Sequence, residues 1–382
     1  MPFTGKATYT AGATLPELAE DVADVVSIVS PYETPLLDHL GEAPYAAGST
    51  YHEWLEDTLN PNTDLIDDAA WSDPAADTSF VVEHGAYFQV GDLLQGAGSS
   101  EVMLVVAADT GSNTLTVSRG YGGTTAESLA DDQVLQILGN AALEGADAPT
   151  ARFTNRMRLG NYTQIFTAAV RASGTDMAVR KLSVADELDY QKQERLRELL
   201  RDLESTLING VAAGSSPEGS SSVRRTMNGL IPTIATNAVD GSSAQLSETL
   251  LNDAMRSIWS SAASHIDTIV VNGYQKRKIN GFITTGRSYQ ADDLTYRNLV
   301  SVYESDFGVC RVILSRSVPA DTVLLLDSSR INVLPLAARS FHYKPLAATG
   351  DYEAGEIIGE YTSEIRNESA HGIITGLATS AS

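Results

Sequence analysis

The chain has 382 residues, of which 43% are hydrophobic and 20% charged, so it can bury one large core or two to three smaller ones. Its formal net charge is −23, and lysine occurs only six times among 26 Lys and Arg. Such a surface lacks the basic stripe that direct nucleic-acid binding requires. No apolar run approaches the roughly 20 residues that span a bilayer, and the first residues lack a secretory signal pattern.

Two explanations of the acidic, lysine-poor composition stay open. Such a surface suits concentrated salt, where a Debye length of about 3 Å screens the repulsion between carboxylates. A GC-rich genome that encodes arginine in place of lysine produces much the same bias. Because the sequence has neither a membrane-spanning run nor a signal pattern, we expect a protein used in the cytoplasm, or inside a particle that is assembled there.

The first part of the chain has the pattern of an arm and not of a domain. Residues 1–48 begin with an extended stretch of small residues, and a short helix is expected to start at Leu15. Pro31, Pro35 and Pro44 prevent the following residues from forming one long element. Residues 51–57 then alternate like a strand, and 161–167 are their expected partner.

The stretch between these two strands has a β pattern of its own. Strands are predicted at 80–82, 87–90, 101–106, 114–117 and 134–138, separated by turns rich in glycine, aspartate and asparagine. This spacing predicts a small barrel inserted at the tip of a hairpin. Asp109, Gly111 and Asn113 are similar to part of a calcium loop, but position 120 is a glycine instead of the bidentate acid, which favours a hairpin turn.

Residues 186–209 predict one long amphipathic helix of about 35–40 Å. Ser183 with Asp186 predicts a capping-box start, and Asn209-Gly210 predicts the stop. One face carries leucines at 188, 196, 199, 200, 203 and 207, and the other carries Glu194, Arg197, Glu198, Arg201 and Glu204. Periodicity alone leaves open whether this helix is the strut of a shell subunit or a core helix of an α/β enzyme.

The second half of the chain predicts an α/β region followed by closing strands. Residues 212–222 are rich in glycine and serine and predict a flexible surface loop. A helix with core-facing residues from Leu246 to Trp259 precedes a buried strand at 268–272 and a basic helical turn at 274–280. Further strands are predicted at 300–303, 310–314, 323–326, 331–334 and 341–343. Residues 356–366 and 371–375 are expected to return and pack on the long helix.

The residues that carry enzyme chemistry do not form a recognisable constellation. Cys310 lies in an apolar run and is read as a small buried hydrophobe. The six histidines are scattered singly, and the usual hydrolase, metalloprotease and nucleotide-binding motifs are missing. The acidic pairs at 67–68, 131–132 and 292–293 are read as solvated surface, and Arg152, Arg156 and Arg158 as ion-pair partners for the surplus acids. We therefore expect no catalytic, cofactor-binding or metal-binding residues, and no enzyme.

The order of these parts resembles the Hong Kong 97-like major capsid proteins of tailed double-stranded DNA viruses. Local sequences similar to one branch of that family are PYETPL at 31–36, EWLED at 53–57, NYTQIF at 161–166, LING at 207–210 and NGLIP at 228–232. The resemblance covers nearly the whole chain. It implies an α+β fold with an N-terminal arm (1–48), extended-loop strands (49–77 and 141–176), an inserted β-barrel (78–140), a P-domain with a spine helix (177–227 and 340–382) and an A-domain (228–339).

The function implied by the resemblance is that of a structural subunit. Such a protein self-assembles as hexamers and pentamers into an icosahedral head that encloses double-stranded DNA without sequence-specific binding, as part of a virion capsid assembled in the host cytoplasm. Separate scaffold, portal and cement or turret proteins are the implied partners, with no cofactor and no membrane. Two alternatives are an encapsulin-like nanocompartment shell protein and a carbohydrate-binding surface protein.

Overall fold

The computed structural model describes residues 33–41, 43–68, 73, 76–149, 151–178, 186–262, 265–282 and 302–380. The chain divides into two compact units, unit 1 with Met1–Trp54 and Leu159–Ser382, and unit 2 with Leu55–Arg158. The helix expected from Leu15 and the expected capping residue Ser183 lie outside the described residues. None of the helices in the described ranges combines the length and the apolar composition that a membrane crossing requires.

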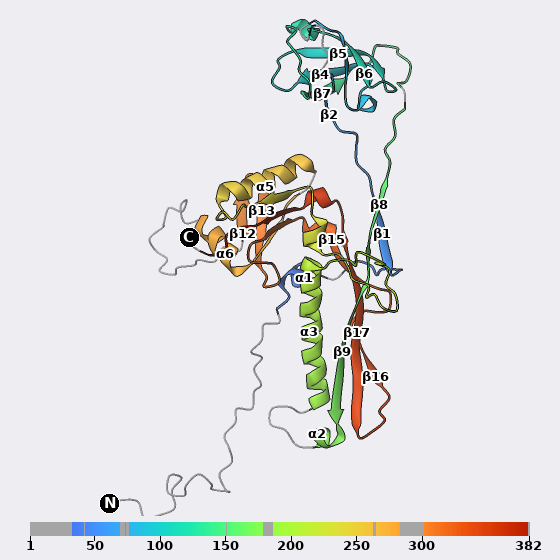
Figure 1. Ribbon diagram of the computed structural model, residues 1–382, viewed down its shortest axis with the longest axis vertical. Coiled ribbons are helices and arrows are strands. Elements are labelled where there is room, and N and C mark those ends of the chain that lie inside the picture. The colour runs from blue at the N-terminus through green and yellow to red at the C-terminus, as the bar shows by residue number, and fades with distance from the viewer. Residues whose placement is uncertain are drawn as a thin grey trace, which may run out of the picture. The chain divides into compact units, whose positions relative to one another are not determined.

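Unit 1 is built around the long predicted helix, α3 (Glu187–Asn209). Asp186 is its N-cap and accepts a hydrogen bond from the Asp189 amide (3.1 Å), and the acids in the first turn favour the positive end of the helix dipole. Ion pairs three residues apart follow its exposed face, at 189–192, 194–197 and 195–198. The helix lies alongside β9 (Gln164–Ser173) and β17 (Tyr352–Ile365) (Figure 1).

Two residues of the long helix lie on a different face from the one predicted. Leu196 is 36% exposed, whereas Glu204, which its charge assigns to the water-facing side, is only 1% exposed. The helix stops at Asn209 as predicted, but Gly210 has a negative φ, so no left-handed residue ends it. A Cβ at Gly210 would lie 2.7 Å from the Met227 carbonyl oxygen, so the glycine is required for the close passage of a second chain segment.

Strand β17 is the centre of a four-stranded antiparallel sheet. It pairs with β9 on one side, from Ser173 opposite Tyr352 to Gln164 opposite Tyr361. On the other side it pairs with β15 (Ile331–Pro335) and β16 (His342–Leu346). Other helices in the described part of unit 1 are α1 (Pro35–Leu40), α2 (Gly174–Ala178), α4 (Leu230–Thr233), α5 (Glu248–Ser261) and α6 (Gly273–Phe282), with short 3-10 turns at Ser328–Arg330 and Glu368–Ala370.

A six-stranded mixed sheet divides the core of unit 1 into two layers. Its order is β10-β18-β14-β11-β13-β12, with bounds Ala238–Asp240, Gly372–Thr375, Val323–Leu326, Thr268–Val271, Gly308–Leu314 and Val302–Ser305. Val270 and Leu324 join the apolar cluster of α3, whereas Ile269 and Leu325 join that of α5. Because both faces are covered, the central strands β11 and β14 are buried at every position and show no alternation.

Two expectations for this region are corrected. Residues 371–375 are expected to pack on the long helix, and Ile373 does join the apolar cluster of α3. However, β18 is an inner strand of the six-stranded sheet, between β10 and β14, and Ile374 joins the cluster of α5 instead. Trp259 was expected in the core with the apolar face of α5, but it lies 65% exposed near the end of that helix. Leu251, Ala254, Met255 and Ile258 do face the core, as predicted.

Unit 2 is a six-stranded antiparallel sheet with its own apolar cluster. The order is β2-β7-β4-β5-β6-β3, with bounds Thr63–Leu65, Val134–Asn140, Asp92–Gly96, Val102–Asp109, Thr114–Ser118 and Ser79–Val81. A bridge between Ile66 and Val82 joins the ends of the two outer strands. This pairing favours a barrel, which stays a prediction.

The strand predictions for unit 2 are partly wrong. Residues 87–90 are not a strand, because the 3-10 turn Gly85–Tyr87 occupies their start; a second such turn is Tyr121–Gly123. Strands β2 and β4 are not among those predicted. The stretch around Asp109 is a hairpin turn between β5 and β6, as favoured, in which the Asp109 carboxylate accepts bonds from Gly111 and Ser112.

The strand predicted at 51–57 is present as β1 (Tyr51–Glu56), but its partner differs. It pairs with β8 (Met157–Tyr162), whereas most of the expected partner, 161–167, belongs to β9 and pairs with β17. The error arises because residues 157–173 form two consecutive strands interrupted only at Thr163, which the alternation of side chains does not reveal.

Candidate functional site: a buried carboxylate junction

Three glutamates of unit 1 are buried deep in the fold: Glu364 is 0% exposed, Glu204 1% and Glu360 3%. We call these residues and their partners the carboxylate junction. Each glutamate binds chain segments that are far apart in the sequence. A buried carboxylate is costly unless it is paired and hydrogen-bonded, so the partners decide what these groups do.

Glu360 of β17 pairs with two arginines. Arg225 Nη2 donates to its Oε1, and Arg339 Nε lies 2.8 Å from its Oε2. The Thr163 hydroxyl donates to the same Oε1 at 2.6 Å, and Arg225 Nε donates to the Thr163 carbonyl at 2.8 Å. Glu360 therefore binds three segments that are far apart in the sequence. They are the residue between β8 and β9, the loop that follows α3, and the segment between β15 and β16.

Glu364, four residues further along β17, binds the segment that precedes unit 2 in the sequence. His52 Nε2 and the Tyr45 hydroxyl each lie 2.6 Å from its Oε2, and Arg366 Nε donates to Oε1. Burial alone would raise the pKa of Glu364, but the hydrogen bonds from Tyr45, His52 and Arg366 outweigh it, and the pKa lies below its ordinary value. The carboxylate is thus held ionised.

Asn161 completes the junction between these two glutamates. Its Nδ2 donates to the Ser363 carbonyl (3.0 Å) and hydroxyl (2.9 Å) and to the Asn228 carbonyl (3.0 Å), while its Oδ1 accepts from the Asn228 amide (2.9 Å). This side chain joins β8 to β17 and to the segment that precedes α4. Because Asn161 is only 6% exposed, these bonds replace water that it cannot reach.

Glu204 of α3 binds the beginning of helix α1. Its Oε2 accepts from the Leu36 amide (3.1 Å) and the Leu37 amide (3.4 Å), and its Oε1 accepts from the Ser315 hydroxyl (2.7 Å). The first amides of a helix have no partner within it, so a carboxylate from a second helix serves as their cap. Burial raises the pKa of Glu204 above its ordinary value, although these hydrogen bonds oppose the shift.

The contacts of the carboxylate junction are those of a structural ion-pair and hydrogen-bond network and not of a catalytic centre. Each glutamate is occupied by arginine, hydroxyl or backbone donors. Sequence reasoning missed it because a polar run such as 360–364 in a strand is normally taken as solvent-facing. One signal in the sequence could have indicated the buried network. Strand β17 contains several charged and hydroxyl residues in succession, and no glycine or proline interrupts that run.

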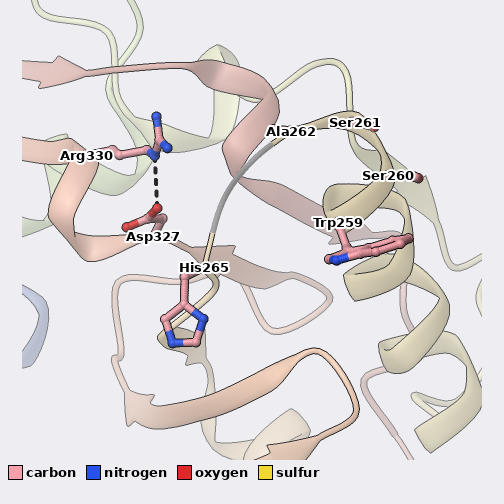
Figure 2. A pocket seen from close by; sticks show the side chains of 7 residues that line it. All are labelled: Trp259, Ser260, Ser261, Ala262, His265, Asp327 and Arg330. Atoms are coloured by element: carbon pink, nitrogen blue, oxygen red, sulfur yellow. Dashed lines mark hydrogen bonds and ion pairs between the residues drawn. The ribbon is translucent and has the colours of Figure 1, made fainter. Parts of the chain in front are cut away.

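A hollow of about 710 Å³ lies at the end of α5 (Figure 2). Its lining residues are Trp259, Ser260, Ser261, Ala262, His265, Asp327 and Arg330. Asp327 pairs with Arg330 (2.9 Å), and the Ser261 hydroxyl bonds to the Ser257 carbonyl (2.8 Å) and to Asn237 (3.0 Å). Among the lining residues, no serine is hydrogen-bonded to a histidine or carboxylate, the arrangement that activates a nucleophile.

The single cysteine is placed as predicted. Cys310 is 1% exposed, its Sγ lies 3.3 Å from the Ile266 carbonyl, and burial raises its thiol pKa to about 12. A thiol of that pKa is not a nucleophile at neutral pH. Two histidines of unit 1 make structural contacts, His39 with Thr268 (2.8 Å) and His52 with Glu364 (2.6 Å). Arg152 of unit 2 donates to the Tyr87 carbonyl (2.8 Å).

The buried His371 predicts that the fold weakens in mild acid. Its Nδ1 accepts from the Asp327 amide (3.2 Å), and burial lowers its pKa below the ordinary 6.5. As the pH falls below 6.5, the unfolded chain binds a proton at His371 that the folded chain does not. The free energy of unfolding should therefore fall, by up to about 1.4 kcal/mol per pH unit for one proton, until the pH reaches the lowered pKa.

Urea denaturation of dissociated subunits between pH 7 and pH 5 measures this dependence. His371→Asn keeps an acceptor near the Nδ1 position and removes the titration, so its stability should change less with pH than that of the wild type. His342→Asn, the same substitution at an exposed position, is the matched control. Equal slopes in the wild type and His371→Asn would contradict the prediction. Glu364 and Asp327, whose pKa values are lowered, should lose their stabilisation only at lower pH, as it falls through those values.

Comparison with known proteins decides the family. The sequence matches the profile of the SU10 major capsid protein family over residues 3–378. The chain belongs to this family. None of the curated proteins matches the sequence significantly.

Solved structures show the same fold at low sequence identity. The capsid of an empty GTA particle has a TM-score of 0.53 with 10% identity, covering 98% of this chain and 100% of that chain. The capsid subunit of cyanophage A-1(L) has a TM-score of 0.53 with 13% identity, covering 95% and 98%. A protein of Gordonia phage Cozz has a TM-score of 0.52 with 11% identity, covering 99% and 98%. The α+β, Hong Kong 97-like capsid fold predicted from the sequence is confirmed.

The family match and the fold together give the capsid protein a structural role in the shell of a tailed phage. This role fits the geometry of the site, because the buried glutamates of the long strand β17 and the long helix α3 bind distant segments of the chain. In the virion, this protein is part of the capsid and contacts other copies of itself.

Proposed function

We propose that the capsid protein assembles as hexamers and pentamers into an icosahedral head that encloses a double-stranded DNA genome, and that it has no enzymatic activity. The observation that carries the proposal is the family match over 3–378, nearly the entire chain. The carboxylate junction supports it, because a subunit that bears load in a shell needs its distant segments fixed to one another.

The proposed division of the chain follows the resemblance. Residues 1–48 form the arm, 49–77 and 141–176 the extended loop, 78–140 an inserted barrel, 177–227 and 340–382 the P-domain, and 228–339 the A-domain. The bridge between Ile66 and Val82 joins the outer strands of the unit 2 sheet and favours a barrel in the extended loop, one that includes β2 (Thr63–Leu65) in addition to 78–140. The compactness of unit 2 as a separate body is consistent with an insertion.

The charge of the chain indicates how DNA is held. A protein of net charge −23 repels a polyanion, so the shell encloses DNA without binding its sequence or depending on phosphate contacts. We propose that assembly takes place in the host cytoplasm, with separate scaffold, portal and cement or turret proteins as partners.

The shell is proposed to be held together without covalent cross-links from the extended loop. An isopeptide bond to asparagine requires a lysine amine as nucleophile. The sequence has no lysine between Lys6 and Lys181, so all of unit 2 lacks that group. The shell is then stabilised by interlocking segments and by ion pairs repeated at the interfaces between subunits.

Purified particles test the proposal directly. Nuclease treatment of intact particles should leave long double-stranded DNA protected, and the same treatment after disruption in urea should degrade it. Boiled particles should give a single band near 40.7 kDa on a denaturing gel. Intact shells without protected DNA would point instead to a nanocompartment, and a ladder of covalent multimers would contradict the non-covalent assembly.

A further inference from the structure

Three side chains that can bind metal meet where the outer strands of the unit 2 sheet come together. Asp64 lies in β2, and Glu83 and His84 follow β3 after one residue, Val82. The bridge between Ile66 and Val82 brings these segments side by side, and the Glu83 amide donates to the Leu65 carbonyl at 3.0 Å. We call this place the seam of unit 2.

The ligand atoms at the seam converge on one point. His84 Nδ1 lies 3.0 Å from Asp64 Oδ1 and 3.9 Å from Glu83 Oε2, and one atom from each residue falls within 4.8 Å of the others. In a tetrahedral zinc site, with metal–ligand distances near 2.1 Å, neighbouring ligand atoms are about 3.4 Å apart. The two distances from His84 Nδ1 bracket that value, and the third pair lies within 4.8 Å, so side-chain movements of about 1 Å suffice to enclose the ion.

The backbone around the three residues is held in place by other bonds. The His84 amide donates to Asp64 Oδ2 (2.8 Å), the Gly85 amide to Asn113 Oδ1 (3.1 Å), and Asn113 Nδ2 to the Glu83 carbonyl (3.0 Å). The Tyr87 ring stacks on the His84 imidazole, with centroids 4.8 Å apart. Contacts that orient the ligands in advance are typical of functional metal sites.

We propose that Asp64, Glu83 and His84 bind a zinc ion that fastens the seam of unit 2. An imidazole nitrogen with two carboxylates suits zinc, whereas magnesium and calcium prefer oxygen ligands throughout. The Asp64 side chain is 4% exposed, but those of Glu83 and His84 are about half exposed, so the ion can enter from solvent and a water completes its coordination. The bound ion stabilises the folded seam because the unfolded chain does not present these ligands together.

Zinc binding to the full-length protein tests the site. Protein freed of metal with EDTA should bind about one Zn²⁺ per chain by calorimetry, and Co²⁺ in its place should show the visible absorption of a four-coordinate ion. Zinc should slow hydrogen exchange in 63–66 and 79–84 without changing exchange in α3. No binding by the wild type would overturn the proposal.

Two variants separate ligation from folding. His84→Phe keeps a ring that can stack on Tyr87 and removes the nitrogen ligand, so zinc affinity should fall about 100-fold or more. Glu83→Gln, at an exposed position, should weaken binding with no loss of fold. Asp131→Asn in the same unit and His342→Asn in unit 1 are matched controls and should bind as the wild type does. Affinity unchanged by His84→Phe and Glu83→Gln, or lost equally in the controls, would show that zinc binds elsewhere.

Discussion

Replacing Glu360 by alanine should lower the free energy of unfolding of the subunit by about 3–5 kcal/mol, because it leaves a buried cation without its partner. The Arg225 side chain is only 18% exposed and loses its carboxylate, and Thr163, which is 0% exposed, loses its acceptor. Domains of ordinary stability have only about 5–15 kcal/mol in total, so shell assembly should fail or become temperature-sensitive. Urea denaturation of dissociated subunits measures the change.

Glu356→Ala is the matched control for Glu360→Ala. It lies on the same strand, four residues earlier, and pairs with Lys344 (3.3 Å), whose side chain is 61% exposed. An exposed pair contributes at most about 1 kcal/mol, so this variant should stay close to the wild type. If both variants cost the same, the burial of Glu360 does not carry the effect. The double variant Glu360→Ala with Arg225→Ala should recover part of the loss, since it removes the uncompensated charge.

Replacing Leu207 by alanine should cost about 2–5 kcal/mol through lost burial and the cavity that remains. Leu207 is 0% exposed in the apolar cluster between α3 and the two sheets of unit 1. Leu196→Ala, the same substitution in the same helix at a 36% exposed position, should cost less than about 1 kcal/mol. Because both changes alter helix propensity equally, the difference measures packing. Equal costs would show that α3 does not carry the core of unit 1.

The parts of the fold that the sequence predicted well are those where one local rule dominates. The periodic leucines and the glycine after Asn209 predicted the extent of helix α3, although Asp186 itself is the N-cap and Gly210 is not left-handed. The inner strands of the six-stranded sheet were visible as short apolar runs. The hairpin between β5 and β6 was visible from its turn residues, because Asp, Gly and Asn make the backbone bonds of a tight turn locally.

The carboxylate junction could not be predicted for a physical reason. Glu204 follows the helical period of the exposed face, and only the arrival of α1 from far away in the sequence gives its carboxylate partners and makes its burial favourable. Glu360 and Glu364 likewise depend on arginines, a histidine and hydroxyls supplied by distant segments. Patterns of hydrophobicity describe single elements, whereas these groups are defined by contacts between elements.

The proposed zinc ligands were missed for the same reason. Asp64 and His84 are 20 residues apart, and nothing in their spacing follows a known metal motif. Only the bridge between Ile66 and Val82, each of which directly follows a three-residue strand, brings them together. Strand β2 is too short for alternation to reveal it.

Cryo-electron microscopy of purified particles tests the central claim most directly. We expect a closed icosahedral shell of hexamers and pentamers in which every subunit has α3 alongside β9 and β17, with Glu360 bound to Arg225 in each copy. Open sheets or small soluble oligomers of folded subunits, or a shell in which this chain only decorates a lattice built by another protein, would contradict it.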